Sequence, residues 1–199
     1  MSDFEDGRLN WCFKVNGAIF FSGKYGSTSQ YAKWISEATG LPVHDVNDTN
    51  ADPLKYDFLI LGSSVIMYNL TIRKWVKQHL TGIVNKPVIL FTVSGAPPGP
   101  KLDSWIDDSL PESLTSQMEQ VALRGRLDLN KVGWWVRLIL KIGAWKNDDP
   151  EARKEELEGF DFMDKSGIEP IKKLVQEIQS EEVASTNEVD PSSSLPCNQ

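Results

Sequence analysis

The stretch that decides the fold is Ala18-Ile-Phe-Phe-Ser-Gly-Lys-Tyr-Gly-Ser-Thr28. Its first four residues, 18–21, are apolar and suit a short buried strand. A loop with two glycines follows, and residues 28–38 carry apolar side chains at helical spacing. The order strand, loop, helix predicts a protein built from alternating strands and helices.

Strands and helices alternate outward from this stretch along most of the chain. Gly40 ends the first helix, since glycine tolerates the positive φ found after many helices. Further strands are expected at 41–46, 57–62, 87–93 and 120–123, and further helices at 71–80, 102–109 and 167–180. Such alternation with short connections predicts an α/β domain with a doubly wound, five-stranded parallel sheet.

The length of 199 residues is enough for one domain with a substantial core. We expect an N-terminal extension at 1–16, one domain at 17–180 and a disordered acidic tail at 181–199. No run reaches the roughly 18 consecutive apolar residues that span a bilayer. Residues 1–8 are too polar and acidic for a secretory signal peptide. A cytoplasmic protein is therefore expected.

Neither the cysteines nor the histidines are arranged as metal ligands. Cys12 and Cys197 lie near opposite ends, and His44 and His79 have no cluster of carboxylates or cysteines beside them. The sequence therefore predicts free thiols and no metal site, and it contains no evident Ser-His-Asp or Cys-His catalytic group. The net charge of −7 at pH 7 argues against general binding to nucleic acid.

The loop between the first strand and the first helix has the composition of an anion site. Backbone N–H groups at a helix N-terminus have no partner within the helix and favour a negative charge. Two glycines allow close approach of the backbone, and three hydroxyl groups add donors. The loop consists of Ser22, Gly23, Lys24, Tyr25, Gly26, Ser27 and Thr28. It matches neither the dinucleotide-binding nor the Walker pattern, and by itself it is explained equally well as a helix cap.

Two further loops, at 63–70 and 94–100, are expected to meet this one, because the carboxyl ends of parallel strands share one edge of a sheet. The first can place an apolar or aromatic side chain against a flat ring, and the second offers backbone groups to a ring edge. The candidate residues are Ser63, Ser64, Val65, Met67, Tyr68, Asn69, Ser94, Gly95 and Ala96. Flavodoxin-type sheets bind FMN at this edge, so we expect FMN as the cofactor.

The chain contains four short motifs in this order: Phe21-Ser22-x-x-x-Gly26-x-Thr28, Leu61-Gly-Ser-Ser64, Trp75-Val-Lys-Gln-His79, and a basic aromatic stretch at 134–142 followed by Arg153-Lys-Glu155. Their order over residues 17–180 resembles the flavodoxin superfamily and, within it, the flavodoxin-like menaquinone-dependent protoporphyrinogen IX dehydrogenases. The resemblance implies a flavodoxin-like fold, bound FMN, a porphyrinogen substrate and a quinone acceptor.

The chain departs from that family at two places. The family's Ile-Arg-Tyr-Gly is here Ile66-Met-Tyr-Asn69, without the arginine. The family's Gly-x-Leu-Arg-Tyr is matched only loosely by Gly125-Arg-Leu127. The resemblance therefore carries FMN binding over to this chain but does not carry over the porphyrinogen substrate.

An insertion at about 125–158 contains a basic, tryptophan-rich segment, Lys131–Trp145. Between residues 124 and 146 there are six basic residues against one acid, Asp128. Apolar residues would cover most of a helix formed by this segment, which is too broad for an isolated surface helix. The segment either packs on the sheet with its cations reaching outward, or contacts a membrane surface or an apolar ligand such as a quinone.

Three classes of function remain open from the sequence. One is an FMN-dependent oxidoreductase of the dehydrogenase kind that passes electrons to a quinone, which the insertion favours. Another is an electron carrier between redox proteins, which the acidic composition favours. The third is a non-redox binding module that has lost its flavin, and a purified protein that takes up no FMN would support it.

Overall fold

A computed structural model describes residues 15–48, 50–129 and 158–187, with side chains described as far as Ser180. The strands are β1 (Gly17–Ser22), β2 (Val43–Asp45), β3 (Phe58–Ile66), β4 (Asn69–Leu70), β5 (Val88–Ser94), β6 (Glu119–Arg124), β7 (Arg126–Leu127) and β8 (Phe160–Asp161). The helices are α1 (Ser27–Thr39), α2 (Arg73–Ile83), α3 (Pro100–Ser109), α4 (Glu112–Thr115) and α7 (Glu169–Asn187), with short 3-10 helices η1 (Pro53–Lys55) and η2 (Lys165–Ile168). Residues 1–14, the segment Lys131–Trp145 and the tail from 188 onward lie outside the described residues.

The larger sheet has the strand order β2-β1-β3-β5-β6, and each neighbouring pair on this path is parallel. β1 lies between β2 and β3, with Ile19 opposite Val43 on one side and Ile60 on the other. The order therefore reverses at β1, as in the flavodoxin-like doubly wound fold. The predicted fold class, an α/β domain with a five-stranded parallel sheet, is confirmed.

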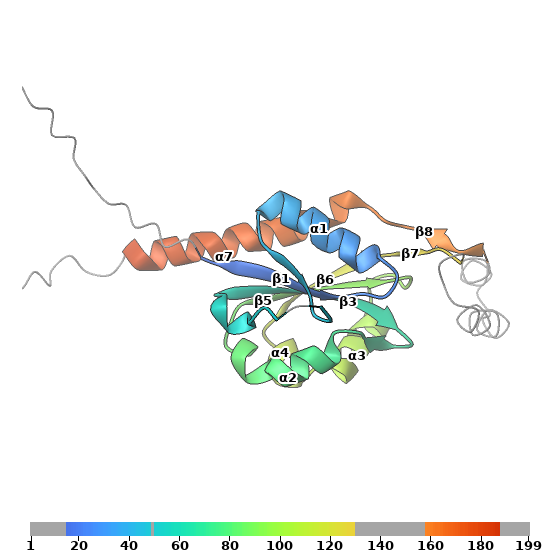
Figure 1. Ribbon diagram of the computed structural model, residues 1–199, viewed down its shortest axis with the longest axis horizontal. Coiled ribbons are helices and arrows are strands. Elements are labelled where there is room, and N and C mark those ends of the chain that lie inside the picture. The colour runs from blue at the N-terminus through green and yellow to red at the C-terminus, as the bar shows by residue number, and fades with distance from the viewer. Residues whose placement is uncertain (1–14, 49, 130–157, 188–199) are drawn as a thin grey trace, which may run out of the picture.

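Helices cover both faces of this sheet: α1 and α7 lie on one face, and α2, α3 and α4 lie on the other (Figure 1). Successive strand residues point to opposite faces, so Phe21 packs with α1 and α7 while Phe20 packs with α2. Every residue of β1 and of β5 is buried. The uninterrupted apolar runs at these positions are typical of a parallel sheet covered on both sides.

The expectation of a loop over 63–70 is wrong in part. β3 continues as a strand to Ile66, and the chain then turns back as β4, which pairs antiparallel with the end of β3. Val65 lies opposite Leu70 in this hairpin. Val65 and Ile66 are β-branched and fit an extended pleated backbone, which favours a longer strand over a loop.

The last part of the chain also differs from the expectation. α7 begins at Glu169, after η2, and continues to Asn187, beyond the expected end at Ser180. The two-residue strands β7 and β8 form a separate antiparallel ladder that the sequence did not predict. In Figure 1 this ladder lies at the end of the domain where β1 leads into α1.

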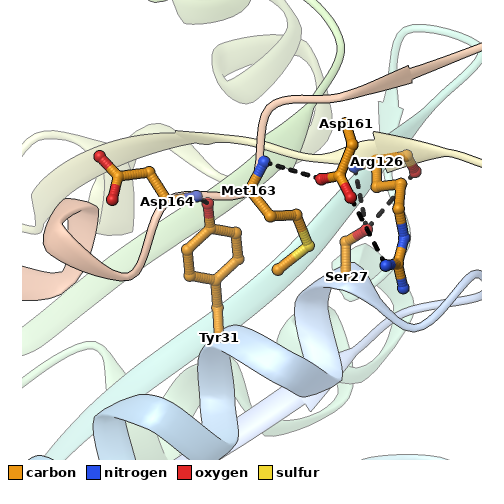
Figure 2. Close-up of polar contacts among 6 residues, drawn as sticks. All are labelled: Ser27, Tyr31, Arg126, Asp161, Met163 and Asp164. Atoms are coloured by element: carbon orange, nitrogen blue, oxygen red, sulfur yellow. Dashed lines mark hydrogen bonds and ion pairs between the residues drawn. The ribbon is translucent and has the colours of Figure 1, made fainter.

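Tyr31 fixes α1 to the region where β6 ends. Its side chain is 1% exposed, and its hydroxyl donates to the carbonyl of Arg124 at 2.9 Å. The same oxygen accepts the backbone N–H of Asp164 at 3.1 Å (Figure 2). Burial raises the pKa of Tyr31 above its ordinary value of 10.0, so the phenol stays protonated and keeps both bonds at neutral pH.

We expect Tyr31→Phe to lower the free energy of unfolding by about 1–3 kcal/mol, because it removes two part-buried hydrogen bonds, to the Arg124 carbonyl and from the Asp164 N–H. Chemical denaturation followed by circular dichroism measures the change. Tyr25→Phe is a matched control, since the Tyr25 hydroxyl has no hydrogen-bond partner in the described part of the chain. Equal stability of wild type and Tyr31→Phe would show that these two hydrogen bonds do not stabilise the fold.

Candidate functional site

The loop Ser22–Thr28 joins the carboxyl end of β1 to the N-terminus of α1. Gly26 occupies the N-cap position with φ of 92°, and no side chain caps the helix. The first N–H groups of a helix have no intrahelical acceptor, so this end offers donors to an anion. A Cβ at Gly23 would lie 2.8 Å from Thr28 Cβ, so only glycine lets the backbone fold this closely over the helix.

Hydroxyl groups connect this loop to the carboxyl-terminal part of β3 and to Thr71, which follows β4. Thr28 Oγ1 and Ser64 Oγ share a hydrogen bond of 2.7 Å, and Thr28 is fully buried. Thr71 donates its hydroxyl proton to the carbonyl of Ser22 at 2.7 Å and lies 3.3 Å from Ser63 Oγ. The structure therefore brings together Ser22, Thr28, Ser63 and Ser64, which the sequence placed in two loops.

Ser27 differs from its neighbours in where its side chain points. Its Oγ accepts the backbone N–H of Arg126 at 3.1 Å and lies 3.5 Å from the Arg126 carbonyl, to which it donates. The hydroxyl predicted to face an anion is thus bonded to β7, whereas the Ser27 backbone N–H belongs to the uncapped first turn of α1. Lys24 is exposed, with Nζ 5.8 Å from the centre of the Tyr25 ring.

The turn between β3 and β4 carries two bulky residues in an unusual conformation. Met67 and Tyr68 have φ of 49° and 64°, the left-handed region that favours glycine. Each side chain is 69% exposed, and the Tyr68 ring lies 5.1 Å from that of Trp105 on α3. Positive φ at both central residues suits a tight two-residue hairpin turn. The turn presents an apolar and an aromatic side chain to solvent at the carboxyl end of β3.

The remaining predicted residue of the second loop, Asn69, stabilises this turn. Its side-chain amide donates to the Met67 carbonyl at 2.8 Å. Its Oδ1 accepts a hydrogen bond from Arg73 at the start of α2. Asn69 is thus tied to the backbone of the turn and to α2 within the described structure.

The loop after β5 is stabilised by a hydrogen bond within the loop and by contacts with Arg124 and Phe160, which the sequence did not predict. Ser94 donates its hydroxyl proton to the Ala96 carbonyl at 2.9 Å, and Arg124 Nη2 donates to the Gly95 carbonyl at 2.7 Å. A Cβ at Gly95 would lie 2.6 Å from Cζ of Phe160. Phe160 gave no signal in the sequence, because β8 is too short to show a period.

The described residues contain no group of three or more histidine, cysteine, aspartate or glutamate side chains placed to hold a metal ion. Among the helices of the described ranges, none is long and apolar enough to cross a membrane. The described residues present backbone N–H groups, hydroxyl groups, the exposed ring of Tyr68 and the exposed thioether of Met67 at this edge of the sheet.

Comparison with known families agrees with this architecture. A family model described as flavodoxin domain matches residues 18–154, which include the three loops. The chain belongs to the flavodoxin-domain family. No curated protein sequence is significantly similar to it.

Several solved structures are similar in fold. The Trp repressor binding protein from Bacillus subtilis is 15% identical, with a TM-score of 0.44, over 75% of this chain and 100% of that one. A flavoprotein from Lactobacillus acidophilus, solved in complex with FMN, is 14% identical, with a TM-score of 0.40, over 56% of this chain and 92% of that one. A flavodoxin from the domain Archaea is 14% identical, with a TM-score of 0.38, over 72% of this chain and 94% of that one.

We expect Met67→Asn to raise the free energy of unfolding by up to about 1 kcal/mol, because asparagine tolerates the left-handed conformation better than methionine does. Little packing is lost, since Met67 is mostly exposed. Thermal and chemical denaturation of the ligand-free protein measure the change. Met67→Leu is the control, because leucine keeps the size and the strain and should bring no gain. A loss of stability in Met67→Asn would contradict the description of this turn.

Proposed function

We propose that the protein is an FMN-binding flavoprotein. The observation that carries the proposal is the direct bond between Thr28 and Ser64, which joins an uncapped helix N-terminus to the carboxyl-terminal part of β3. The loop after β5 ends at the same edge of the sheet, because β3 and β5 are parallel neighbours. Membership of the flavodoxin-domain family supports FMN as the ligand of this edge.

The residues present suit the parts of FMN. The phosphate would be held by backbone N–H groups of residues 23–28 and by the hydroxyl groups of Ser22 and Thr28. Met67 and Tyr68 are exposed and fit one face of a flat aromatic ring. Backbone groups of Ser94–Ala96 would meet the ring edge. When bound, FMN supplies the electron-transfer chemistry, while the chain's own residues bind and orient it.

Within this class we propose an oxidoreductase that resembles the protoporphyrinogen dehydrogenases and uses a quinone as electron acceptor. The observation in favour is the position of the two short strands that flank the insertion. β7 lies at the start of the insertion and β8 follows its end, and Phe160 of β8 lies against Gly95 of the loop proposed to meet the ring edge. We propose that Lys131–Trp145, which lies between these two strands in the sequence, binds the quinone.

A second candidate is an electron carrier that exchanges electrons with a redox protein. The net charge of −7 favours it, because an acidic surface steers a basic partner toward the protein. The two candidates share the cofactor and differ in the acceptor, so they are separated by the acceptor that reoxidises the reduced protein.

We expect the purified protein to bind FMN about 100-fold or more tightly than riboflavin, since two charge-assisted hydrogen bonds to the phosphate are each worth about 1.5–3 kcal/mol. Quenching of flavin fluorescence on titration gives both affinities. Thr28→Val should weaken FMN binding about 10-fold and riboflavin binding much less. A colourless protein that binds neither flavin would support a non-redox module and refute the proposal.

The control for this variant is Thr39→Val at the other end of α1. The Thr39 hydroxyl donates to the Ile35 carbonyl at 2.7 Å and lies far along the helix from the loop. Its FMN affinity should equal that of wild type. An equal loss in Thr39→Val and Thr28→Val would show that the effect comes from the helix as a whole and not from the phosphate loop.

We expect the reduced, FMN-loaded protein to be reoxidised faster by a menaquinone analogue than by a small basic redox protein such as a cytochrome. Anaerobic stopped-flow absorbance measures both rates. Replacing Trp134 and Trp135 by alanine should slow the quinone reaction several-fold and leave FMN affinity unchanged, with Trp11→Ala as the control. If the redox protein reacts faster and the double variant reacts normally with quinone, the electron-carrier function is favoured instead.

A further inference from the structure

The antiparallel pair β7–β8, called the stem below, consists of Arg126–Leu127 and Phe160–Asp161. Arg126 Nη1 lies 3.6 Å from Asp161 Oδ2, and both side chains are about half exposed. An exposed ion pair adds little stability, and a two-stranded ladder this short is not stable alone. The order of the stem must therefore come from the parts of the domain that it contacts.

The first such contact is made by Ser27, at the start of α1. Its Oγ bonds both the N–H and the carbonyl of Arg126, and the residue is 7% exposed (Figure 2). Ser27 thus presents its backbone N–H to the proposed phosphate and its side chain to the stem. No other predicted residue of the Ser22–Thr28 loop has a described bond to the stem.

The second contact lies one turn further along α1. Tyr31 bonds Arg124, just before β7, and Asp164, just after β8, as described above. The backbone N–H of Met163 donates to Asp161 Oδ1 at 3.1 Å, which links β8 to the chain that leads to Asp164 (Figure 2). α1 therefore holds the strand that enters the stem and the strand that leaves it.

The third contact joins the stem to the loop after β5. The Gly125 N–H donates to the Ser94 carbonyl at 2.9 Å, and the Gly125 carbonyl accepts from Phe162 N–H at 3.1 Å. The Arg124 guanidinium, which bonds the Gly95 carbonyl, lies 3.7 Å from the centre of the Phe162 ring. Two of the three loops proposed to hold FMN are therefore in contact with the stem or the residues that flank it.

We propose that the stem is energetically coupled to the FMN site, with Ser27 as the positioning residue between the phosphate and Arg126. This inference rests on the proposed function, because FMN is the ligand that it invokes. Binding that fixes the first turn of α1 also fixes Ser27 Oγ, and so favours the ordered stem. Linkage is reciprocal, so the ordered stem strengthens FMN binding by the same factor.

Coupling of this kind extends to the two strands that flank the insertion. The stem holds the two ends of the chain segment that contains Lys131–Trp145. FMN-loaded protein then presents these ends in one arrangement, whereas FMN-free protein holds them less firmly.

Amide hydrogen exchange of the full-length protein, with and without FMN, tests the proposal. In wild type we expect FMN to slow exchange at Arg126 and Phe162 by about 10-fold or more, within the usual range of couplings between sites. Ser27→Ala keeps the backbone N–H but removes both bonds to Arg126. It should reduce this protection to about 3-fold or less and weaken FMN binding by a similar factor.

Two controls isolate the role of Ser27. Arg126→Ala removes the guanidinium but keeps the backbone groups that Ser27 bonds, so it should retain the protection of the stem by FMN. Ser29→Ala changes the same residue type two positions further along α1 and should behave as wild type. Loss of FMN binding in Arg126→Ala with normal protection in Ser27→Ala would overturn the proposal and indicate a direct role for the guanidinium.

The remaining outcomes separate this inference from the proposed function. If FMN binds, seen as a change in flavin absorption, and the stem amides exchange as fast as before, the coupling is refuted and FMN binding stands. If FMN does not bind to the wild-type protein at all, the proposed function fails and the coupling fails with it.

Discussion

The turn from β1 into α1 is the constraint on which the rest of the structure depends. β1 lies at the point where the strand order reverses, and parallel strands must be joined by crossovers. The helix after β1 lies on one face of the sheet and the helix after β3 lies on the other (Figure 1). The connections that follow β1 and β3 therefore lead to opposite faces of the sheet. A hydrogen bond between Thr28 and Ser64 joins them where they separate.

The same helix organises the chain beyond β6. Ser27 and Tyr31 lie four residues apart and so share a face of α1. Their hydroxyl groups satisfy backbone groups of Arg124, Arg126 and Asp164, which a two-residue ladder could not satisfy by itself. Hydrogen bonds from α1 thus stabilise the stem. The position of α1 on the sheet therefore places the stem beside the loop proposed to meet the ring edge.

Much of the fold could be predicted from the sequence, because the central strands are uninterrupted apolar runs. The strand at 18–21 and the helix ended by Gly40 were expected almost as they occur, and Gly40 has φ of 74°. The hairpin tip was missed because Met67 and Tyr68 adopt a conformation that bulky side chains disfavour. No local sequence pattern predicts this turn, because the pairing of Val65 with Leu70 determines it.

The site was predicted in outline and missed in its connections. The three loops were found because their compositions are local, whereas the bonds of Ser27 depend on a residue far along the chain. Arg124 and Phe160 could not be assigned to the site, because their contacts with Gly95 come from tertiary structure alone. The sequence shows that a serine in a glycine-rich turn can donate a hydrogen bond, but it does not show which group accepts it.

The central claim is that the uncapped start of α1 binds the phosphate of FMN. Titration of isotope-labelled protein with FMN, followed by amide NMR, tests it most directly. The account predicts that the largest chemical-shift changes fall on the N–H groups of residues 23–28, and that riboflavin leaves these groups nearly unchanged. Saturable binding of FMN with its largest changes outside the three loops, or equal changes with riboflavin at 23–28, would contradict it.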